Sequence, residues 1–547
     1  MTREIVLRFG LIFSLIAIFL LSIFRIFFGV DFTDESFYLA VGHAFNLGNI
    51  PFVDEFYIQQ TAALYLAPFQ KVYLTLNGST SGIVLFFRFI LLLNNFLIAI
   101  FFYWHLKSIK PTEDQPDDKI SALLTALPIF VFAPYSIYQL SYNTLSLQFI
   151  FLFTVLFQKF LISQDRKFLF TGAVCLGIAM GTYPPIAPIA GIICVILLLK
   201  RTSLLNVIIF SGCVALGLIP IFISTIDAGF QSLLNAISFH VSYGAQAGGT
   251  SKIMDLLPRP INFILHLGIT LITFKIFKKK PTLASGWLIL LIIGIPISKW
   301  GSSDSHWILN SYAILLAPIW FSFKKSIWTD GTLRPTLMFL AIFAILISWT
   351  SNNGTLAATG AAVIFICFSL KLFKDNGFKI PAAVLGVGIS LIVILMQYRV
   401  VYRDDNLSSL SELITEGPFK GLKTSLKKRQ LNDQIISDLK KISSDKTILF
   451  YDNFPAGYLY SDRKPFGYAI WMPPYQIKKE NRGRFLRYYL ERNNTPDVIF
   501  EFKKIIFTSS QFYDVRIEDT DPLKNHFRKA GYSVLSENEN YTMSIKN

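Results

Sequence analysis

The chain has 547 residues, of which 53% are hydrophobic and 16% charged, and 52 of them are phenylalanine. Soluble domains usually have about a quarter of their residues charged, and the mean hydropathy here is +0.49. This composition excludes a disordered chain, a coiled coil and a water-soluble multidomain enzyme. The net charge of +16 indicates either a nucleic-acid partner or an excess of basic residues in cytoplasmic loops.

Apolar runs recur along the first 399 residues. A bilayer core needs about 20 mostly apolar residues per helix, so the sequence predicts a polytopic α-helical membrane protein with about thirteen transmembrane helices. The first run is interpreted as a retained helix, because no small-residue cleavage site follows it. The expected spans are 5–30, 81–106, 119–138, 144–162, 168–184, 186–200, 204–224, 260–277, 283–299, 307–323, 334–350, 356–373 and 380–398.

The basic residues predict the orientation of these spans. With a cytoplasmic N-terminus, the inner segments hold twenty Lys and Arg residues, and the outer segments of residues 1–399 hold seven, as the positive-inside rule requires. Residues 1–399 would then form a transmembrane catalytic domain with long outer loops at 31–80 and 225–259. The positive charge follows from this topology, so no nucleic-acid partner is expected.

Residues 400–547 have a different pattern. Short apolar runs at 447–451 and 497–500 have strand length, and they alternate with amphipathic stretches at 430–443, 483–493 and 521–530. This pattern predicts a compact soluble α/β domain, which the parity of the spans places outside the membrane. The four cysteines all lie in apolar runs without metal-ligand spacing, which favours core packing over disulfides or zinc.

The first outer loop is the most informative segment. Asp34 and Glu35 are expected to open a helix that ends near Leu47-Gly48-Asn49, and a second amphipathic helix is expected over 61–76. Its carboxylates all precede the first basic residue of the loop: Asp31, Asp34, Glu35, Asp54 and Glu55. Helix capping and solvation explain any one of them, but five together repel one another and favour a functional cluster.

The motifs in this loop resemble those of a known family. Asp31-Phe-Thr-Asp34-Glu35-Ser-Phe-Tyr38, followed by Gly48-Asn-Ile-Pro51-Phe-Val-Asp54-Glu55, resembles polyprenyl-phosphate-sugar-dependent glycosyltransferases of the GT-C fold. Protein O-mannosyltransferases and aminoarabinose transferases belong to this class. The element Leu449-Phe-Tyr-Asp452-Asn-Phe-Pro455-Ala-Gly-Tyr458-Leu-Tyr460 is similar to the outer domain of such enzymes. These motifs cover about 25 residues, whereas the order of the parts agrees along the whole chain.

The resemblance implies transfer of a sugar from a polyprenyl-phosphate donor to a lipid, glycan or protein acceptor, with inversion, at the outer face of the membrane. The Phe-, Ile- and Lys-rich composition favours a bacterial inner membrane, and an enzyme of the endoplasmic reticulum would have the same topology. Asp34 matches the catalytic base, with Glu35 positioning the acceptor or the helix, and Asp31 is the rival base. An acceptor site is expected at Tyr38, Asp54, Glu55 and Asn143, although 141–144 equally fits a helix cap. No cofactor is expected, and a divalent metal ion between the carboxylates is the less favoured alternative.

The donor phosphate needs a cationic partner. Related enzymes often have a Lys-Pro-Pro sequence after the second acidic element, whereas this chain has Tyr57-Ile-Gln-Gln-Thr61. The phosphate ligands are therefore expected among other outer residues, namely Arg88, Lys252, Arg259, Lys299, His240 and His306. Arg88 lies inside a span and equally fits a structural ion pair; for Arg259, at a span entrance, interfacial snorkelling is the better explanation.

Two other classes remain open. A transporter or lipid flippase would usually have related halves and ionisable residues near the middle of the bilayer. The sequence has no clear repeat, its outer acids cluster in one loop, and a large outer domain follows, all of which favour the enzyme. A polymerase or ligase of lipid-linked glycans would share the long outer loops and differ in its product.

Overall fold

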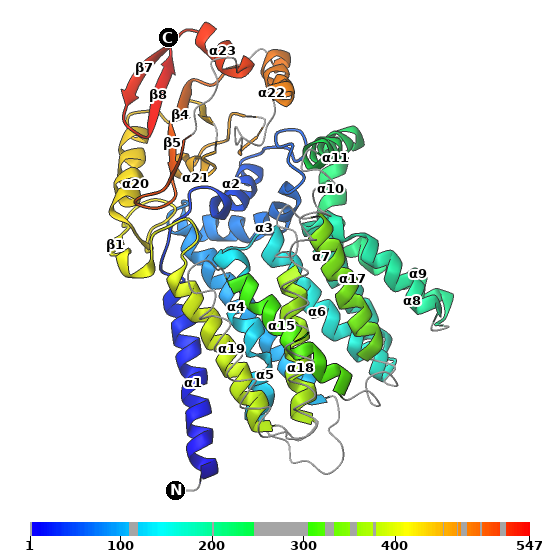
Figure 1. Cartoon of the computed structure of the whole chain (residues 1–547). Helices are drawn as coiled ribbons and strands as arrows, with labels where there is room; N and C mark the ends of the chain where they lie inside the picture. Colours follow the sequence, from blue (N-terminus) through cyan, green and yellow to red (C-terminus); the bar gives the residue numbers. More distant parts are fainter. Residues whose placement is uncertain are drawn as a thin grey trace.

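The structure is a computed structural model in which a helical bundle carries a smaller α/β segment at one end (Figure 1). The bundle is built from sequence-distant helices; for example, α19 packs against both α1 and α5. The structure describes residues 3–108, 119–199, 202–245, 268, 305–322, 333–350, 358–375, 379–451, 453–467, 469–471, 479–492, 495–514 and 521–547. The helices of the bundle and its margin are α1 (Arg3–Arg25), α4 (Ile83–Ser108), α5 (Lys119–Val131), α6 (Tyr142–Ser163), α7 (Arg166–Thr182), α8 (Pro188–Leu199), α9 (Leu204–Gly217), α10 (Ile219–Ala228), α11 (Phe230–Ala245), α15 (Ser305–Ser322), α17 (Leu333–Thr350), α18 (Thr359–Asp375) and α19 (Lys379–Arg399).

Three helices in the described residues are long and apolar enough to cross a membrane: Ile83–Leu106, Tyr142–Ser163 and Pro381–Arg399. A fourth span results if α9 and α10, bent by 60° relative to each other, are counted as one. The expectation of about thirteen spans is therefore not met. Other apolar runs form shorter helices, such as Pro184–Leu199 and Pro335–Trp349. The spans expected at 260–277 and 283–299 lie outside the described residues.

Helices α7 and α9 cross at two glycines. A Cβ atom added to Gly177 would overlap the carbonyl oxygen of Val214, and one added to Gly217 would overlap the carbonyl oxygen of Val174. Small residues at such crossings let two backbones approach closely, which is how helices in membranes gain van der Waals contact. The position of α9 against α7 therefore depends on the absence of a side chain at both glycines.

We expect Gly177→Ala to lower the thermal unfolding midpoint in detergent, because the new methyl group pushes the two backbones apart. The expected loss in the free energy of unfolding is about 1–3 kcal/mol. Gly212→Ala is the matched control, since no atom lies within 4 Å of a Cβ at that position of α9. Alanine is favoured over glycine in a helix, so the control should leave the midpoint unchanged or raise it. Equal midpoints for both variants would contradict the close crossing.

The first outer loop forms two helices between the bundle and the α/β segment (Figure 1). These are α2 (Asp34–Asn46) and α3 (Gln60–Asn77), which confirms both helices expected from the sequence. They pack on each other, and Gln70 of α3 donates a hydrogen bond to the carbonyl oxygen of Leu39. Helix α2 thereby lies over one end of the bundle. At this end α1 and α19 finish and α4 begins.

Residues beyond α19 form a small four-stranded sheet with flanking helices. Its strand order is β3-β4-β8-β7, with β3 parallel to β4 and the other pairs antiparallel. The strands expected at 447–451 and 497–500 are confirmed as β3 and β4, and the three amphipathic stretches as α20, α22 and α23. The elements are β1 (Glu412–Leu413), β2 (Lys423–Thr424), α20 (Leu426–Leu439), β3 (Ile448–Tyr451), α21 (Ala456–Ser461), α22 (Lys479–Arg492), β4 (Val498–Phe502), β5 (Lys504–Ile506), β6 (Phe512–Asp514), α23 (Pro522–Lys529), β7 (Tyr532–Glu537) and β8 (Tyr541–Lys546).

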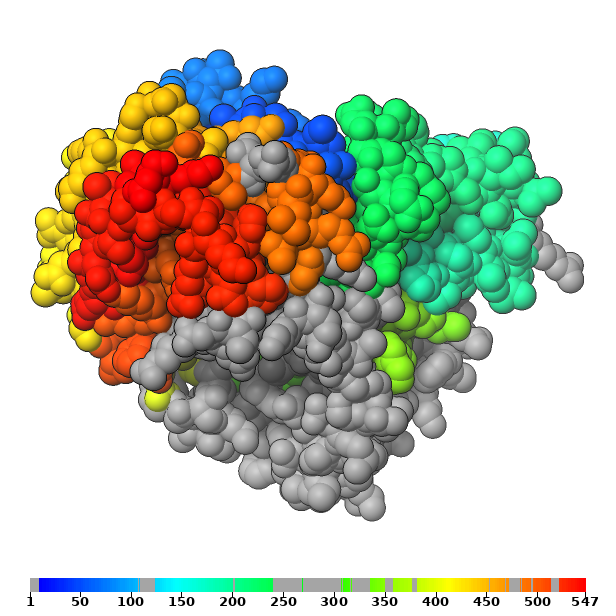
Figure 2. Space-filling model, turned by 90° about the horizontal axis from the view of Figure 1, so that it is seen from above, coloured from blue at the N-terminus to red at the C-terminus, as the bar shows by residue number. Residues whose placement is uncertain are grey.

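This C-terminal segment (residues 400–547) is docked by backbone hydrogen bonds on residues 27–32, which lead from α1 into the first outer loop. Gly29 N–H donates to the carbonyl of Lys423 at 2.8 Å, and Lys423 N–H donates to the carbonyl of Phe27 at 2.7 Å. Ala456 N–H donates to the carbonyl of Phe32 at 3.1 Å. Figure 2 shows the orange residues of the segment beside the blue residues of the loop. Both ends of the 27–32 stretch are therefore held by residues more than 390 positions away.

Candidate functional site

Asp31 organises the start of α2. Its Oδ1 accepts hydrogen bonds from the backbone N–H of Thr33 at 3.1 Å and from the Thr33 hydroxyl at 2.6 Å, and its Oδ2 accepts from the N–H of Glu35 at 2.9 Å. The first N–H groups of a helix have no partner within the helix, and a buried carboxylate just before it satisfies them. Both oxygens of the rival base are thus engaged in holding the helix start.

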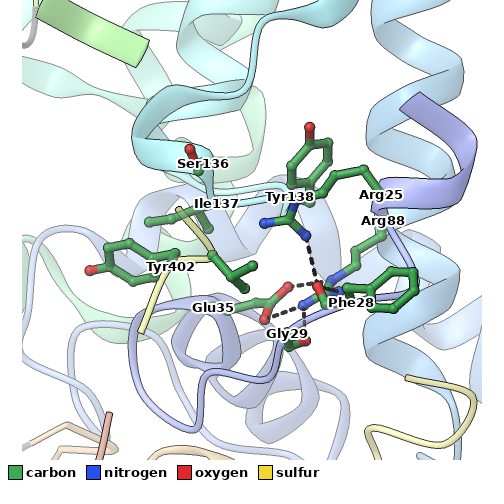
Figure 3. Close-up of a pocket in the computed structure, with 10 residues that line it drawn as sticks. Arg25, Phe28, Gly29, Glu35, Arg88, Ser136, Ile137, Tyr138 and Tyr402 are labelled. Atoms are coloured by element: carbon green, nitrogen blue, oxygen red, sulfur yellow. Dashed lines mark hydrogen bonds and ion pairs between the residues drawn. The ribbon is translucent and has the colours of Figure 1, made fainter. Parts of the chain in front are cut away.

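Glu35 and Arg88 form a buried bidentate ion pair between α2 and α4, with N–O distances of 2.6 and 2.7 Å (Figure 3). Arg88 also donates to the carbonyls of Ile26, Phe28 and Gly29 at 2.7–3.0 Å. A guanidinium has five N–H donors, and these five bonds use all of them. The expectation that Arg88 binds the donor phosphate is corrected: in this arrangement it is the structural ion pair.

The small pocket beside this pair is not a substrate site. Its volume is about 10 Å³, and Arg25, Tyr138 and Tyr402 are among its lining residues (Figure 3). Arg25 donates to the carbonyls of Phe28 at 2.8 Å and Gln397 at 2.7 Å. A cavity of this size is near the minimum for a single water molecule. The pocket is therefore part of the hydrogen-bond network of Arg25 and Arg88, which joins the ends of α1, α4 and α19.

Asp34 is placed differently from its two acidic neighbours. Its Oδ2 accepts a hydrogen bond from the Tyr402 hydroxyl and pairs with the Arg403 guanidinium at 3.1 Å. Its Oδ1 is buried and has no hydrogen-bond partner in the described part of the chain, although 24% of the side chain as a whole is exposed. Of the three carboxylates at the start of α2, Asp34 is thus the one that keeps an oxygen without a hydrogen bond.

The surroundings of Asp34 tune its basicity. Burial raises the pKa of Asp34 above the ordinary value of a carboxyl group, Arg403 opposes that rise, and the nearby Asp31 charge adds to it. Burial also raises the pKa of Tyr402, so its phenol stays protonated and keeps donating to Asp34. A fixed carboxylate with a raised pKa and an unbonded oxygen is suited to accept a proton.

Sequence reasoning missed Tyr402 and Arg403. Arg403 also donates to the Thr33 hydroxyl and lies 3.9 Å from Asp31, so a single cation serves both acids. It is held in turn by the buried Lys428, whose ammonium donates to the backbone carbonyl of Arg403. The available signal was an aromatic-basic pair directly after the last expected span, on the side that the sequence predicts to be outside, where the positive-inside rule does not predict a basic residue.

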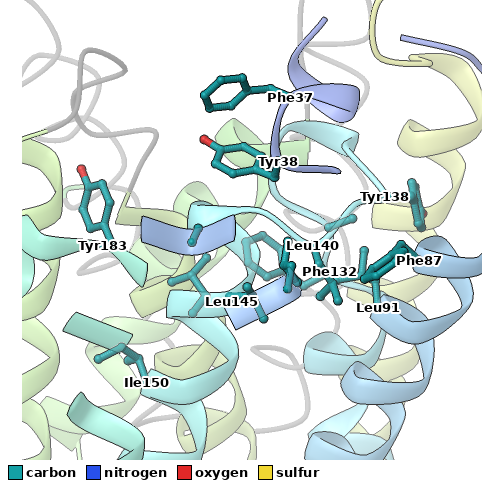
Figure 4. Close-up of a cluster of buried hydrophobic side chains, with 14 of the residues drawn as sticks. Phe37, Tyr38, Phe87, Leu91, Phe132, Tyr138, Leu140, Leu145, Ile150 and Tyr183 are labelled. Atoms are coloured by element: carbon teal, nitrogen blue, oxygen red, sulfur yellow. The ribbon is translucent and has the colours of Figure 1, made fainter. Parts of the chain in front are cut away.

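Tyr38 lies one turn beyond Asp34 on α2, so both side chains are on the same face. Its ring centroid is 5.7 Å from that of Tyr142, which is 5.3 Å from that of Tyr183. Figure 4 shows Tyr38 and Tyr183 at the upper edge of the apolar cluster that includes Leu145. An aromatic row thus borders the bundle on the Asp34 side of α2.

Asn143, expected at the acceptor site, is in the first turn of α6. Its neighbours Ser141 and Thr144 form a capping box, in which each hydroxyl meets the other residue's backbone N–H. The helix-cap interpretation of 141–144 is therefore confirmed for Ser141 and Thr144. The role of Asn143 in binding an acceptor stays a prediction.

Asp54 and Glu55 contact the C-terminal segment. Asp54 Oδ1 accepts from the Tyr488 hydroxyl at 2.9 Å and pairs with Arg492 at 3.2 Å. Glu55 Oε2 accepts from the N–H of Ile470 at 2.9 Å, and burial raises its pKa to about 7. Within the described residues, no hydrogen bond or ion pair joins either acid to Asp34. The five acids of the loop thus separate into a group at the start of α2 and a pair against residues 470–492.

His306, expected near the donor phosphate, is buried in the bundle. Its Nδ1 is 2.8 Å from the Thr359 hydroxyl, and its Nε2 accepts from the backbone N–H of Tyr135 at 2.5 Å. Both ring nitrogens are engaged, so the structure corrects this expectation: His306 holds the turn around Tyr135. The side chain of His240, in α11, and the residues Lys252, Arg259 and Lys299 lie outside what the structure describes.

The described residues contain no group of three or more His, Cys, Asp or Glu side chains that could hold a metal ion. No protein-family model matches the sequence, and no curated protein matches it. The assignment of function therefore depends on the geometry around Asp34 and on the motifs that contain it.

Proposed function

We propose that the protein is a membrane glycosyltransferase of the GT-C class that takes a sugar from a polyprenyl-phosphate donor and uses Asp34 as its base. The observation that carries the proposal is the asymmetry of this carboxylate: one oxygen is held by Tyr402 and Arg403, while the other is without a hydrogen bond. The acidic motifs around Asp34 support the donor class. The acceptor would be a lipid, a glycan or a protein.

The chemistry balances with the groups present. The acceptor hydroxyl gives its proton to the Asp34 carboxylate while its oxygen bonds to the anomeric carbon, on the face opposite the phosphate. The bond from that carbon to the phosphate oxygen breaks, its electrons leave with the lipid phosphate, and the configuration inverts. A phosphate is a stable leaving group, so the site needs a base more than an acid. Arg403 and Tyr402 keep the carboxylate oriented.

The proposed cellular setting is the outer face of a bacterial inner membrane, with the N-terminus cytoplasmic and the C-terminal segment outside. The apolar helices and the unequal distribution of basic residues support membrane insertion in this orientation. Spans at 260–277 and 283–299, outside the described residues, are part of this proposal in addition to the apolar helices of the described chain. His240, Lys252, Arg259 and Lys299 remain the predicted ligands of the donor phosphate.

The deciding experiment is an assay with the full-length protein in detergent, supplied with radiolabelled polyprenyl-phosphate sugar and a membrane lipid extract. Transfer would be supported if the label appears in a molecule that is distinct from the lipid-linked donor. The alternative classes have their own outcomes. Movement of donor across liposomes without a covalent product would favour a transporter or flippase, and repeated addition of glycan units would favour a polymerase.

The pH dependence of transfer should depend on Arg403. Asp34 acts as a base only when ionised, so activity is present above its pKa and lost as the pH falls through it. Arg403 lowers that pKa against the effect of burial, so Arg403→Gln should move the acidic limb of the rate profile to higher pH. Arg429→Gln, which removes an exposed partner of Glu412, is the control and should not move it. A limb that stays in place or moves to lower pH would contradict the assignment.

A further inference from the structure

A second cavity, of about 260 Å³, lies between the loop that follows α2 and the C-terminal segment. It includes none of the residues that surround Asp34. In Figure 1, α22 lies next to the blue loop between α2 and α3, and the bond from Tyr488 to Asp54 joins these two parts across the cavity wall. The volume is slightly below the roughly 300–1,000 Å³ of pockets for drug-sized ligands, so it suits a single ring with a substituent.

The cavity has an excess of positive charge. Arg492 is paired with Asp54 and lies over the ring of Tyr488, with 3.7 Å from guanidinium carbon to ring centroid. Lys464 is exposed, and its ammonium donates to the carbonyl of Gly48 at 3.1 Å. In the described part of the chain no carboxylate pairs with Lys464. An anion at the cavity would therefore meet one cation that is already compensated and one that is not.

The wall of the cavity also presents a polar group that needs a partner. Asn49 is 5% exposed, and its Oδ1 has no hydrogen-bond partner among the described residues. A buried acceptor without a donor is unfavourable by about 1–3 kcal/mol, so a rotation of the Asn49 side chain that brings Oδ1 to a ligand hydroxyl would be favoured. Phe466, Tyr488 and Tyr489 add aromatic surface to the lining, against which the C–H groups of a sugar ring can pack.

We propose that this cavity binds an anionic sugar unit, a pyranose carrying a carboxylate or a phosphate. The ring would pack on the aromatic side chains, a hydroxyl would donate to Asn49 Oδ1, and the anion would meet Lys464 and Arg492. The binding stands apart from the transfer reaction. We also infer that this sugar unit is part of the acceptor, and this second inference rests on the proposed function.

The test is ligand-observed NMR with the full chain in detergent, using glucuronic acid, glucose 6-phosphate, glucose and inorganic phosphate as probes. Glucuronic acid or glucose 6-phosphate should bind, and glucose should bind more weakly. Lys464→Gln should weaken binding of the charged sugar about fivefold, and Lys440→Gln, the same change at the exposed residue that follows α20, should not. Asn49→Ala should weaken the binding of the charged sugar without changing the affinity for inorganic phosphate.

The outcomes separate this inference from the proposed function. Binding that persists in Asp34→Asn, a variant expected to lose transfer, supports the cavity as an independent site. Equal affinities of Lys464→Gln and Lys440→Gln would overturn the proposal, as would the absence of binding by both charged sugars. If inorganic phosphate competes as well as the charged sugars, the site recognises a bare anion, and the sugar assignment is wrong. A folded state is checked for each variant by gel filtration and thermal unfolding.

Discussion

Asp34→Asn should lower the rate of sugar transfer by about 10²- to 10⁴-fold, the usual contribution of a general base, while binding of the lipid donor persists. Asparagine has nearly the same shape and can still accept the hydrogen bond from Tyr402, so the start of α2 should remain in place. The amide cannot take the acceptor's proton. The measurement is the single-turnover rate at saturating donor, together with donor affinity by equilibrium binding.

Two matched variants sharpen this result. Asp31→Asn removes the rival base, and we expect it to affect mainly stability, because both Asp31 oxygens cap the helix. Asp433→Asn removes an exposed carboxylate of α20 that faces Arg429 and should be silent in both assays. A fully active Asp34→Asn protein would exclude Asp34 as the base, and a loss of transfer specific to Asp31→Asn would move the role to that residue.

Arg88→Met should lower stability by about 3–5 kcal/mol, because it leaves Glu35 buried without its charge partner. The double variant Glu35→Gln/Arg88→Met should recover part of this loss, since no uncompensated charge then remains inside. The measurement is the thermal unfolding midpoint in detergent. The three backbone carbonyls that Arg88 serves lose their donor in both variants, so the recovery should be incomplete.

The control for this pair is the exposed ion pair Lys167–Asp165 on the first turn of α7, where the lysine side chain is 69% exposed. Lys167→Met should change stability by no more than about 1 kcal/mol. If Arg88→Met instead leaves the unfolding midpoint unchanged and raises only the KM for the lipid-phosphate donor, then Arg88 binds phosphate and its structural assignment is wrong.

Local patterns predicted the local elements of this protein. The acids before an apolar stretch predicted the start of α2, and the short apolar runs predicted β3 and β4, because capping and strand periodicity act over a few residues. Run length overestimated the spans, since it does not show where a helix bends, as between Gly217 and Leu218. The partners of Asp34 were beyond local reasoning, because Tyr402 is 368 residues away in the sequence.

The candidate site was predicted in part for the same reason. Asp34, Asp31 and Glu35 do lie together, as their spacing on one helix start requires. What each one does depends on groups from other elements: Arg88 from α4 neutralises Glu35, and Arg403 pairs with Asp34. A carboxylate's role is decided by such partners, and a single sequence does not show which cation folds back onto which acid.

The docking of Lys423 against Phe27 and Gly29 has a consequence for biosynthesis. The chain is made from its N-terminus, so the first outer loop emerges long before the residues that complete it. Until Tyr402, Arg403 and Lys423 are synthesised, Asp34 has neither its hydrogen-bond donor nor its cation, and the 27–32 stretch lacks its backbone partners. The order of translation thus means that the site cannot form before the residues that follow α19 have been made, so that a chain cut short after α19 would carry the acids without the environment that makes one of them a base.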